Sequence, residues 1–164
     1  EHYDAPKLFD LLKTTLCENT GLGLAAPQIG IYTRVFVFGD PSAPDSIIPV
    51  FNPRIVDPDP KDMYSNDKID QVYIEEGCLS APGLFVKVKR PKNIRVRYTT
   101  HEGVTDTIML TGLSARVFLH EYDHLNGILF TDRANSIHLS RAKRQKEKLD
   151  RMRKKNENRI REIG

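Results

Sequence analysis

Residues 120–130 read HEYDHLNGILF, and this stretch constrains both the fold and the chemistry of the chain. His120 and His124 stand four residues apart, with Glu121 beside the first. On a helix this spacing turns both imidazoles to one side, where they can bind one divalent metal ion. Gly127 is a helix stop, so the histidines should lie on the last turns of one helix. A catalytic metal site usually has three protein ligands, and the motif supplies only two.

A third ligand is not evident downstream of this helix. In metzincin proteases a histidine follows three residues after the helix-ending glycine, but Phe130 occupies that position here. The remaining histidines are weaker candidates, because they lie at the chain start, in a polar turn and just ahead of the C-terminal segment: His2, His101 and His138. The sequence therefore favours another residue type.

Cys78 is the third ligand that the sequence favours. It lies between Gly77 and Leu79 at the end of a predicted strand, where a glycine lets a ligand or another backbone approach closely. A thiolate is a strong ligand for borderline metals. A lone cysteine is more often an inert core thiol, but two histidines already in place reverse that preference.

The composition indicates one globular domain of 164 residues, with 39% apolar and 29% charged residues. The apolar runs are far shorter than the roughly 20 residues that span a bilayer, and the start does not resemble a signal peptide. We therefore expect no contact with a membrane. Cys17 and Cys78 are too few for a disulfide framework, which favours a reducing intracellular compartment. We expect Cys17 to be buried or half-buried in a helix.

The hydrophobic periodicity predicts helices at both ends of the chain and strands between them. The predicted helices cover 5–18, 113–126 and the segment from Ser140 to the chain end. The predicted strands cover 31–38, 47–56, 71–75, 84–90, 93–100 and 104–110. Residues 57–70 are acidic and rich in turn formers, which indicates a mobile surface loop. This order predicts an α+β fold with antiparallel β-sheets packed around the central HExxH helix.

The charge is distributed unevenly along the chain. Residues 141–164 contain eleven Lys or Arg and four Asp or Glu, a balance of +7. The rest of the chain carries 14 basic and 18 acidic residues, a balance of −4. We predict a catalytic, metal-dependent domain over 1–140 and a basic helical extension of it over 141–164. Such an extension can meet a polyanion or an acidic surface, or it can be a solvated helix that aids solubility.

Three motifs together resemble the signature motifs of the peptide deformylase family. They are GLGLAAPQ at 21–28, EGCLS at 76–80 and HEYDH at 120–124, in the family's order and at suitable separations. The resemblance extends from the first helix to the chain end and includes the basic C-terminal helix. It implies a metal-dependent hydrolase that removes the N-formyl group from the N-terminal formyl-methionine of newly synthesised polypeptides.

Each residue of the expected metal site would have a role in such a hydrolase. Cys78, His120 and His124 would hold one divalent metal ion. The resemblance implies ferrous iron as the native ion, and the same ligands suit zinc, nickel or cobalt. Glu121 would take a proton from water and pass it to the departing amine.

Two further groups are expected around the metal. The resemblance implies that the oxyanion formed during hydrolysis accepts hydrogen bonds from the Gln28 side-chain amide and the Leu79 backbone N–H. Three residues are expected behind the ligands, where they orient histidines and neutralise charge: Glu76, Arg90 and Asp123.

An apolar slot for the methionine side chain is expected beside the metal. Stepping back by three and by seven residues from the first histidine of the motif gives Val117 and Leu113 on the same helical face. Leu22 and Ile74 would complete the slot. Gly23 keeps its loop slim, so that the substrate backbone can lie along it as an added strand. Core packing explains the apolar residues equally well.

Two other functions remain open on the sequence. A zinc endopeptidase using the HEYDH motif would need a third ligand after the helix, where only His138 or tail carboxylates are available. A non-enzymatic ribosome- or nucleic-acid-binding module with a structural metal would need a fourth ligand. For the favoured function, we expect a monomer whose basic helix contacts the ribosome. Its compartment would be the bacterial cytoplasm, or an organelle matrix or stroma.

Overall fold

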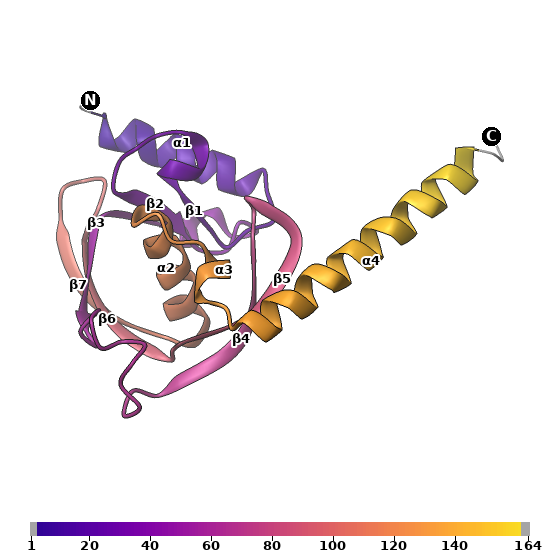
Figure 1. Cartoon of the computed structure of the whole chain (residues 1–164). Helices are drawn as coiled ribbons and strands as arrows, with labels where there is room; N and C mark the ends of the chain where they lie inside the picture. The colour runs from indigo at the N-terminus through magenta and orange to yellow at the C-terminus, as the bar shows by residue number, and fades with distance from the viewer. Residues whose placement is uncertain (1–2, 162–164) are drawn as a thin grey trace.

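Antiparallel strands and helix α2 build the body of the molecule, and helix α4 extends from it (Figure 1). The computed structural model describes residues 3–161. The helices are α1 (Ala5–Cys17), α2 (Gly112–Leu125), α3 (Phe130–Arg133) and α4 (Ser136–Arg161), with 3₁₀ turns η1 (Ala26–Ile29) and η2 (Pro44–Ser46). The strands are β1 (Gly23–Ala25), β2 (Val35–Phe38), β3 (Ile48–Asp57), β4 (Gln71–Cys78), β5 (Ala81–Pro91), β6 (Asn93–Thr99) and β7 (Thr105–Thr111). The fold is α+β, as predicted.

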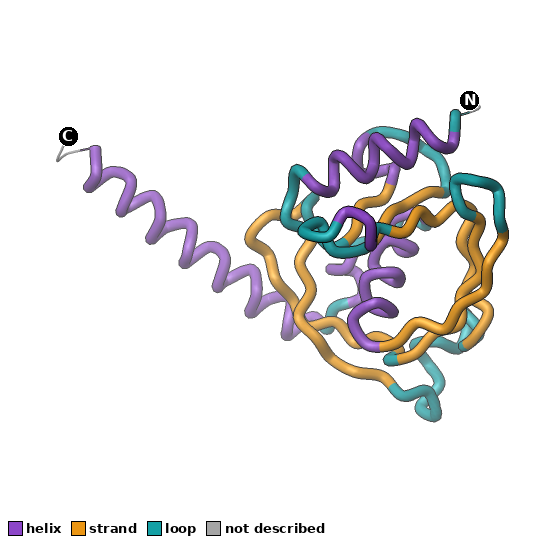
Figure 2. The backbone as a smooth tube through the Cα atoms, turned by 180° about the vertical axis from the view of Figure 1, so that it is seen from behind, coloured by secondary structure: helices purple, strands orange, loops and turns teal. Residues whose placement is uncertain are grey.

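The strands form one larger sheet and one separate hairpin. The larger sheet has the order β1-β2-β3-β6-β7, and β4 pairs with β5. Each of these pairings is antiparallel. Figures 1 and 2 show the strands curving around α2, which contacts β1, β2, β5, β6 and β7. This position holds the HExxH helix against strands of both sheets.

The main core forms between the larger sheet and α2. Ile94, Val96 and Tyr98 alternate with exposed residues along β6 and join Phe118 of α2 in one buried cluster. This alternation is the pattern of a half-buried strand. The Phe118 ring meets the Phe36 ring edge-on, with centroids 5.0 Å apart. Burial of one such side chain contributes about 1.5–3 kcal/mol, so this contact fixes α2 on the sheet.

Helix α1 packs through a single stripe of leucines. Leu8, Leu12 and Leu16 are buried, and Asp4 caps the helix by accepting a backbone hydrogen bond at 3.2 Å. Cys17 is exposed, so the prediction of a buried or half-buried thiol was wrong. The reason is helical geometry, because the residue after Leu16 points about 100° away from the buried stripe.

Segment 57–70 is not simply a surface loop, which corrects its prediction. Met63 is 2% exposed and belongs to the main core, and the Tyr64 hydroxyl accepts a hydrogen bond from Arg90 at 3.1 Å. The composition of the segment did not indicate these two contacts, because two buried side chains hardly change the average polarity of fourteen residues.

The predicted element boundaries differ from the structure near the site. Strand β1 and helix α3 were not predicted, because three or four residues are too few to show a periodic pattern. Helix α4 begins at Ser136 and not near Ser140. The side chain of Asn135 accepts a hydrogen bond from the Ile137 N–H at 2.8 Å, and so caps the helix one turn earlier than expected.

Helix α4 packs on the body only through its first turns. Leu139 and Ala142 lie against the buried residues Val86 and Val88 of β5. Past Lys146 the side chains described are almost all exposed, and Figure 1 shows the helix leaving the body. Among the described residues, no helix is both long enough and apolar enough to cross a membrane.

Candidate metal centre

The three expected ligands come together from two elements. Cys78 ends β4, and His120 and His124 lie one turn apart on α2. Their ligand atoms all lie within 4.8 Å of one another, and the Cys78 Sγ is 3.3 Å from the His124 Nε2. The β4–β5 register shifts between Glu76 and Cys78. Such bulges re-aim side chains, and this one precedes the thiol that meets α2.

The chemistry of this group fits a divalent metal ion. Burial raises the pKa of the Cys78 thiol, but hydrogen bonds with His120 and His124 outweigh burial and lower that pKa to about 5. Burial lowers the pKa of His120, but contacts with Cys78 and Glu76 raise it to about 10. Near neutral pH the thiol is therefore a thiolate, and His120 holds a proton that a bound metal would replace. One thiolate and two imidazoles suit zinc, ferrous iron, nickel or cobalt.

Glu121 lies beside this group with an unsatisfied carboxyl oxygen. The residue is 3% exposed, and its Oε2 has no hydrogen-bond partner among the described residues. Burial raises the pKa of this carboxyl to about 7, although the nearby histidines act to lower it. A carboxyl whose pKa lies near neutrality is suited to both accepting and donating a proton.

Gln28 is held at both ends of its amide. Its Oε1 accepts a hydrogen bond from the Ala25 N–H at 2.8 Å, which fixes the orientation of the side chain. Its Nε2 donates to the Ser80 Oγ at 3.0 Å and lies 3.6 Å from the Cys78 Sγ. Leu79 lines the same cavity. A neutral amide donor beside the thiol can stabilise an oxyanion.

A cavity of about 550 Å³ opens beside the metal-binding group. Four of the residues expected around the substrate line it: Leu22, Gly23, Leu113 and Val117. Ile74, expected in the same slot, is not among the lining residues, which differs from the prediction. Glu75 and Glu76, which follow it on β4, do line the cavity, so this wall of the cavity begins one residue after Ile74.

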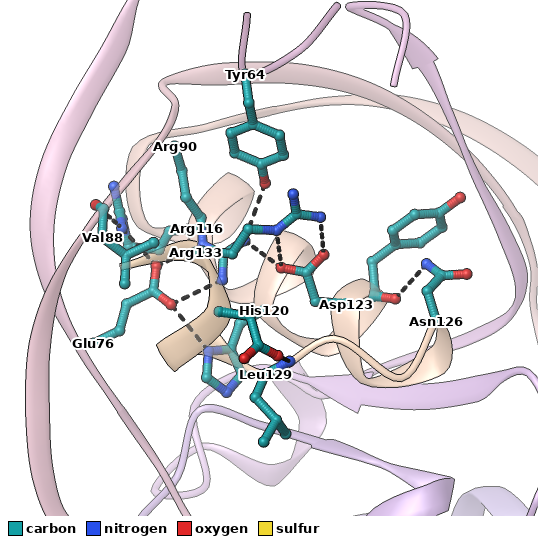
Figure 3. A network of polar contacts seen from close by, with 12 residues as sticks. Tyr64, Glu76, Val88, Arg90, Arg116, His120, Asp123, Asn126, Leu129 and Arg133 are labelled. Atoms are coloured by element: carbon teal, nitrogen blue, oxygen red, sulfur yellow. Dashed lines mark hydrogen bonds and ion pairs between the residues drawn. The ribbon is translucent and has the colours of Figure 1, made fainter. Parts of the chain in front are cut away.

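A buried network of charges extends from His120, one member of the metal-binding group (Figure 3). Arg90 is fully buried, donates to both oxygens of Glu76 at 2.6 and 3.0 Å, and donates to Asp123 at 2.8 Å. The second oxygen of Glu76 is 3.1 Å from the His120 Nδ1. Burial raises the pKa of Glu76, but hydrogen bonds from His120 and Arg90 lower it to about 2. The charged carboxylate can therefore orient the imidazole.

Three residues that the sequence analysis missed complete this network: Arg116, Arg133 and Tyr64. Arg116 had a signal in the sequence, because it precedes the first histidine of the motif by four residues and so shares its helical face. Arg133 and Tyr64 come from α3 and from segment 57–70. No spacing in the sequence connects them to the motif.

The other histidines considered as ligands lie elsewhere. His101 packs against Phe9 with ring centroids 4.6 Å apart, and His138 packs against Tyr73 at 5.7 Å. Neither belongs to the metal-binding group, and His2 lies outside the described residues. Within residues 3–161, the residue that joins the two histidines in a group able to hold a metal ion therefore lies upstream of the motif and not downstream.

The fold and the site define an α+β protein with a Cys-His-His metal-binding group beside a cavity. A family model described as polypeptide deformylase matches residues 3–140. The chain belongs to the peptide deformylase family, whose members are metal-dependent hydrolases acting on N-formylmethionyl chains.

Individual relatives agree with this membership. The peptide deformylase of Thermotoga petrophila is 42% identical over 127 residues, which cover 77% of this chain and 70% of that protein. Peptide deformylase 1B, chloroplastic/mitochondrial, of Arabidopsis thaliana is 37% identical over 87% of this chain, which spans 50% of that protein's length. The crystal structure of a peptide deformylase from Legionella pneumophila matches with a TM-score of 0.75 at 31% identity, covering 93% of this chain and 84% of that one.

Proposed function

We propose that this protein removes the N-formyl group from the N-terminal formyl-methionine of newly synthesised polypeptides, using one divalent metal ion. One observation carries the proposal. Cys78, His120 and His124 meet within 4.8 Å beside the cavity, and the same cavity is lined by Glu121 and Gln28. Hydrolysis of a formamide needs activated water, donors for an oxyanion and a proton for the departing amine. Residues of this site can supply each of these three requirements.

The metal ligands are Cys78, His120 and His124 in this proposal. A divalent ion held there supplies a Lewis acid and activates water near neutral pH. We propose ferrous iron as the native ion on the family resemblance alone, because the lowered pKa of the thiol favours thiolate ligation of any divalent ion held there. Zinc, nickel and cobalt suit the same ligands.

Glu121 transfers a proton from the attacking water to the departing nitrogen in this proposal. Its free Oε2 and its pKa near 7 suit it to take a proton from the attacking water and to return it to the nitrogen as the C–N bond breaks. The products are formate and a free amino terminus. General acid–base work of this kind contributes about 10²- to 10⁴-fold in rate.

The formyl oxygen is stabilised by donors that are already oriented. Gln28 cannot rotate freely, because its Oε1 is bound to the Ala25 N–H. Its amide and the Leu79 backbone N–H donate to the developing oxyanion in this proposal. Both donors are uncharged, so they stabilise the oxyanion without neutralising the nucleophile.

The substrate's methionine occupies the apolar part of the cavity. Leu22, Leu113 and Val117 line it, and Leu22 and Leu113 are 40% and 59% exposed in the free protein. A bound side chain would remove this apolar surface from water, which favours binding. The substrate backbone lies along β1 in this proposal, because β1 is an edge strand of the larger sheet and an extended peptide can pair with it.

Release of formate from a formyl-Met-Ala-Ser peptide tests the proposed function. The protein is prepared without oxygen, and its metal content is measured in the same sample. We expect the rate to follow the bound metal, and we expect no release of acetate from acetyl-Met-Ala-Ser. If the metal-loaded protein cleaves an internal bond of an unfolded polypeptide but leaves the formyl peptide intact, the endopeptidase function is correct instead.

The ribosome is the partner that we propose for helix α4. The first turns of the helix are held on β5 by Leu139 and Ala142, which leaves the basic segment beyond Lys146 exposed. A run of lysine and arginine on an exposed helix attracts a polyanion such as ribosomal RNA. We further propose that the protein acts as a monomer, in the bacterial cytoplasm or in an organelle matrix or stroma.

A further inference from the structure

Arg116 occupies an unusual place for a charged side chain. It lies on α2 one turn before His120, it lines the cavity, and it is 4% exposed. A buried charge is costly unless hydrogen bonds and an opposite charge compensate for the lost hydration. The partners of this guanidinium therefore indicate what the residue contributes.

Those partners all belong to the β4–β5 hairpin. The Arg116 Nη1 donates to Glu76 at 2.5 Å and to the Val88 carbonyl oxygen at 3.0 Å, and its Nη2 donates to the Val72 carbonyl oxygen at 2.7 Å. Val72 and Glu76 are on β4, and Val88 is on β5. One side chain thus connects α2, which carries two metal ligands, to both strands of the hairpin that carries Cys78.

The contact with Glu76 extends the connection to a metal ligand. The Oε1 of Glu76 accepts from both Arg90 and Arg116, and its Oε2 accepts from Arg90 and faces the Nδ1 of His120 (Figure 3). With Oε1 occupied by two arginines, the carboxylate has little freedom to rotate away from the imidazole. An outer hydrogen bond of this kind fixes the ring and the tautomer of a ligand histidine.

We infer that Arg116 is a positioning residue of the metal centre. It acts on the reaction through Glu76 and His120, and it sets the separation of Cys78 from the two histidines by bracing α2 against the hairpin. The functional part of this inference rests on the proposed function. The geometric part concerns only metal binding, so it can be tested separately.

Binding of Co²⁺ to the metal-free full-length protein tests this role. Affinity is measured by competition with a chromophoric chelator, and the cobalt–thiolate absorption reports the geometry around the ion. For Arg116→Met we expect about 10- to 100-fold weaker Co²⁺ binding and an altered absorption band, the usual scale for the loss of an outer partner. Arg116→Lys keeps the charge but not the planar fork, so it should fall between Met and wild type.

Arg133→Met is the matched control. Arg133 belongs to the same network and is partly buried, but it contacts Asp123 and not Glu76. The Arg133→Met variant should have a lower melting temperature than wild type. Its Co²⁺ affinity should stay within about threefold of the wild-type value, and its absorption band should be unchanged.

The melting temperature and Co²⁺ binding of the two Arg116 variants together decide whether Arg116 positions the metal centre. If Arg116→Met and Arg116→Lys lower the melting temperature but bind Co²⁺ with wild-type affinity and absorption, Arg116 is structural only and the inference is wrong. If Arg116→Met does not fold, Arg116→Lys carries the test by the same two readouts. Neither readout depends on formate release. A failure of the proposed function would therefore be seen separately, because metal-loaded wild-type protein would then release no formate from a formyl-Met peptide.

Discussion

Gly23 lies against the Glu121 carboxyl, where a larger side chain has no room. A Cβ at Gly23 would stand 2.5 Å from the Glu121 Oε1, whereas a Cβ at Gly21 would lie 3.0 and 3.1 Å from the Leu79 Cδ1 and Cγ and 3.4 Å from the Gly23 carbonyl oxygen. We predict that Gly23→Ala lowers kcat by about 10- to 100-fold, because the carboxyl must move. Gly21→Ala should cost much less. Steady-state kinetics with a formyl-Met peptide measures both, and a wild-type kcat for Gly23→Ala would contradict this reading.

Glu121→Gln separates proton transfer from metal binding. The substitution keeps the shape of the side chain and removes its proton affinity, so we predict a loss of about 100-fold or more in kcat with full metal content. Elemental analysis and kinetics on the same sample measure both quantities. Loss of the metal in this variant would assign Glu121 to the ligands.

At the level of single residues, the sequence could predict what local spacing determines. The two histidines share a helical face, and Cys78 follows from the motif and its glycine, so the structure places all three together as expected. Arg133 and Tyr64 could not be predicted, because their approach to Asp123 and Arg90 depends on tertiary packing. Ile74 was expected in the slot for its apolar character, and that character alone does not place a strand residue at the cavity.

An aromatic contact joins helix α2 to the sheet. The Phe118 ring meets the rings of Phe36 and Phe38 with centroids 5.0 and 5.9 Å apart, and its side chain is fully buried. We predict that Phe118→Ala lowers the free energy of unfolding by about 3–5 kcal/mol, as measured by urea titration. Leu113→Ala on the same helix, 59% exposed, should change it by less than about 1 kcal/mol. Equal effects would contradict the assignment of the core face.

At the level of elements, periodic segments were predictable and short or capped ones were not. Strands β6 and β7 and helix α2 lie within two residues of their predicted bounds, because long alternating or helical patterns leave little ambiguity. The predicted start of α4 was wrong because Asn135 and Ser140 are both good N-caps. Only the packing of the first turn on β5 decides between them.

At the level of the whole molecule, the basic tail and the metal centre should be separable. The apolar contacts of α4 with the body involve Leu139 and Ala142, and the next side chain beside the body is Lys146, whose Cε would lie 3.8 Å from a Cβ added at Gly83. We predict that truncation after Lys148 leaves hydrolysis of a short formyl-Met peptide nearly unchanged and abolishes salt-sensitive cosedimentation with ribosomes. Equal cosedimentation of the full and truncated proteins would exclude a tether. A collapse of peptide hydrolysis would show that the tail is structural.

A C-terminal helix was predicted from the Ser140 cap, and the structure contains one, α4. Its departure from the body could not be predicted, because the sequence does not reveal that its first turns dock on β5 while the rest stays exposed. The two-sheet arrangement around α2 likewise depends on strand order, which local patterns do not encode.

The central claim is that Cys78 completes the metal site begun by the two histidines, and paired cysteine variants test it most directly. Cys78→Ser and Cys17→Ser are prepared without oxygen, and metal content and formate release from a formyl-Met peptide are measured on each. Cys17 is exposed on α1, away from the metal-binding group, so its variant should match wild type in both quantities. Cys78→Ser should lose metal and rate together. A Cys78→Ser protein with full metal content and full rate would contradict the account.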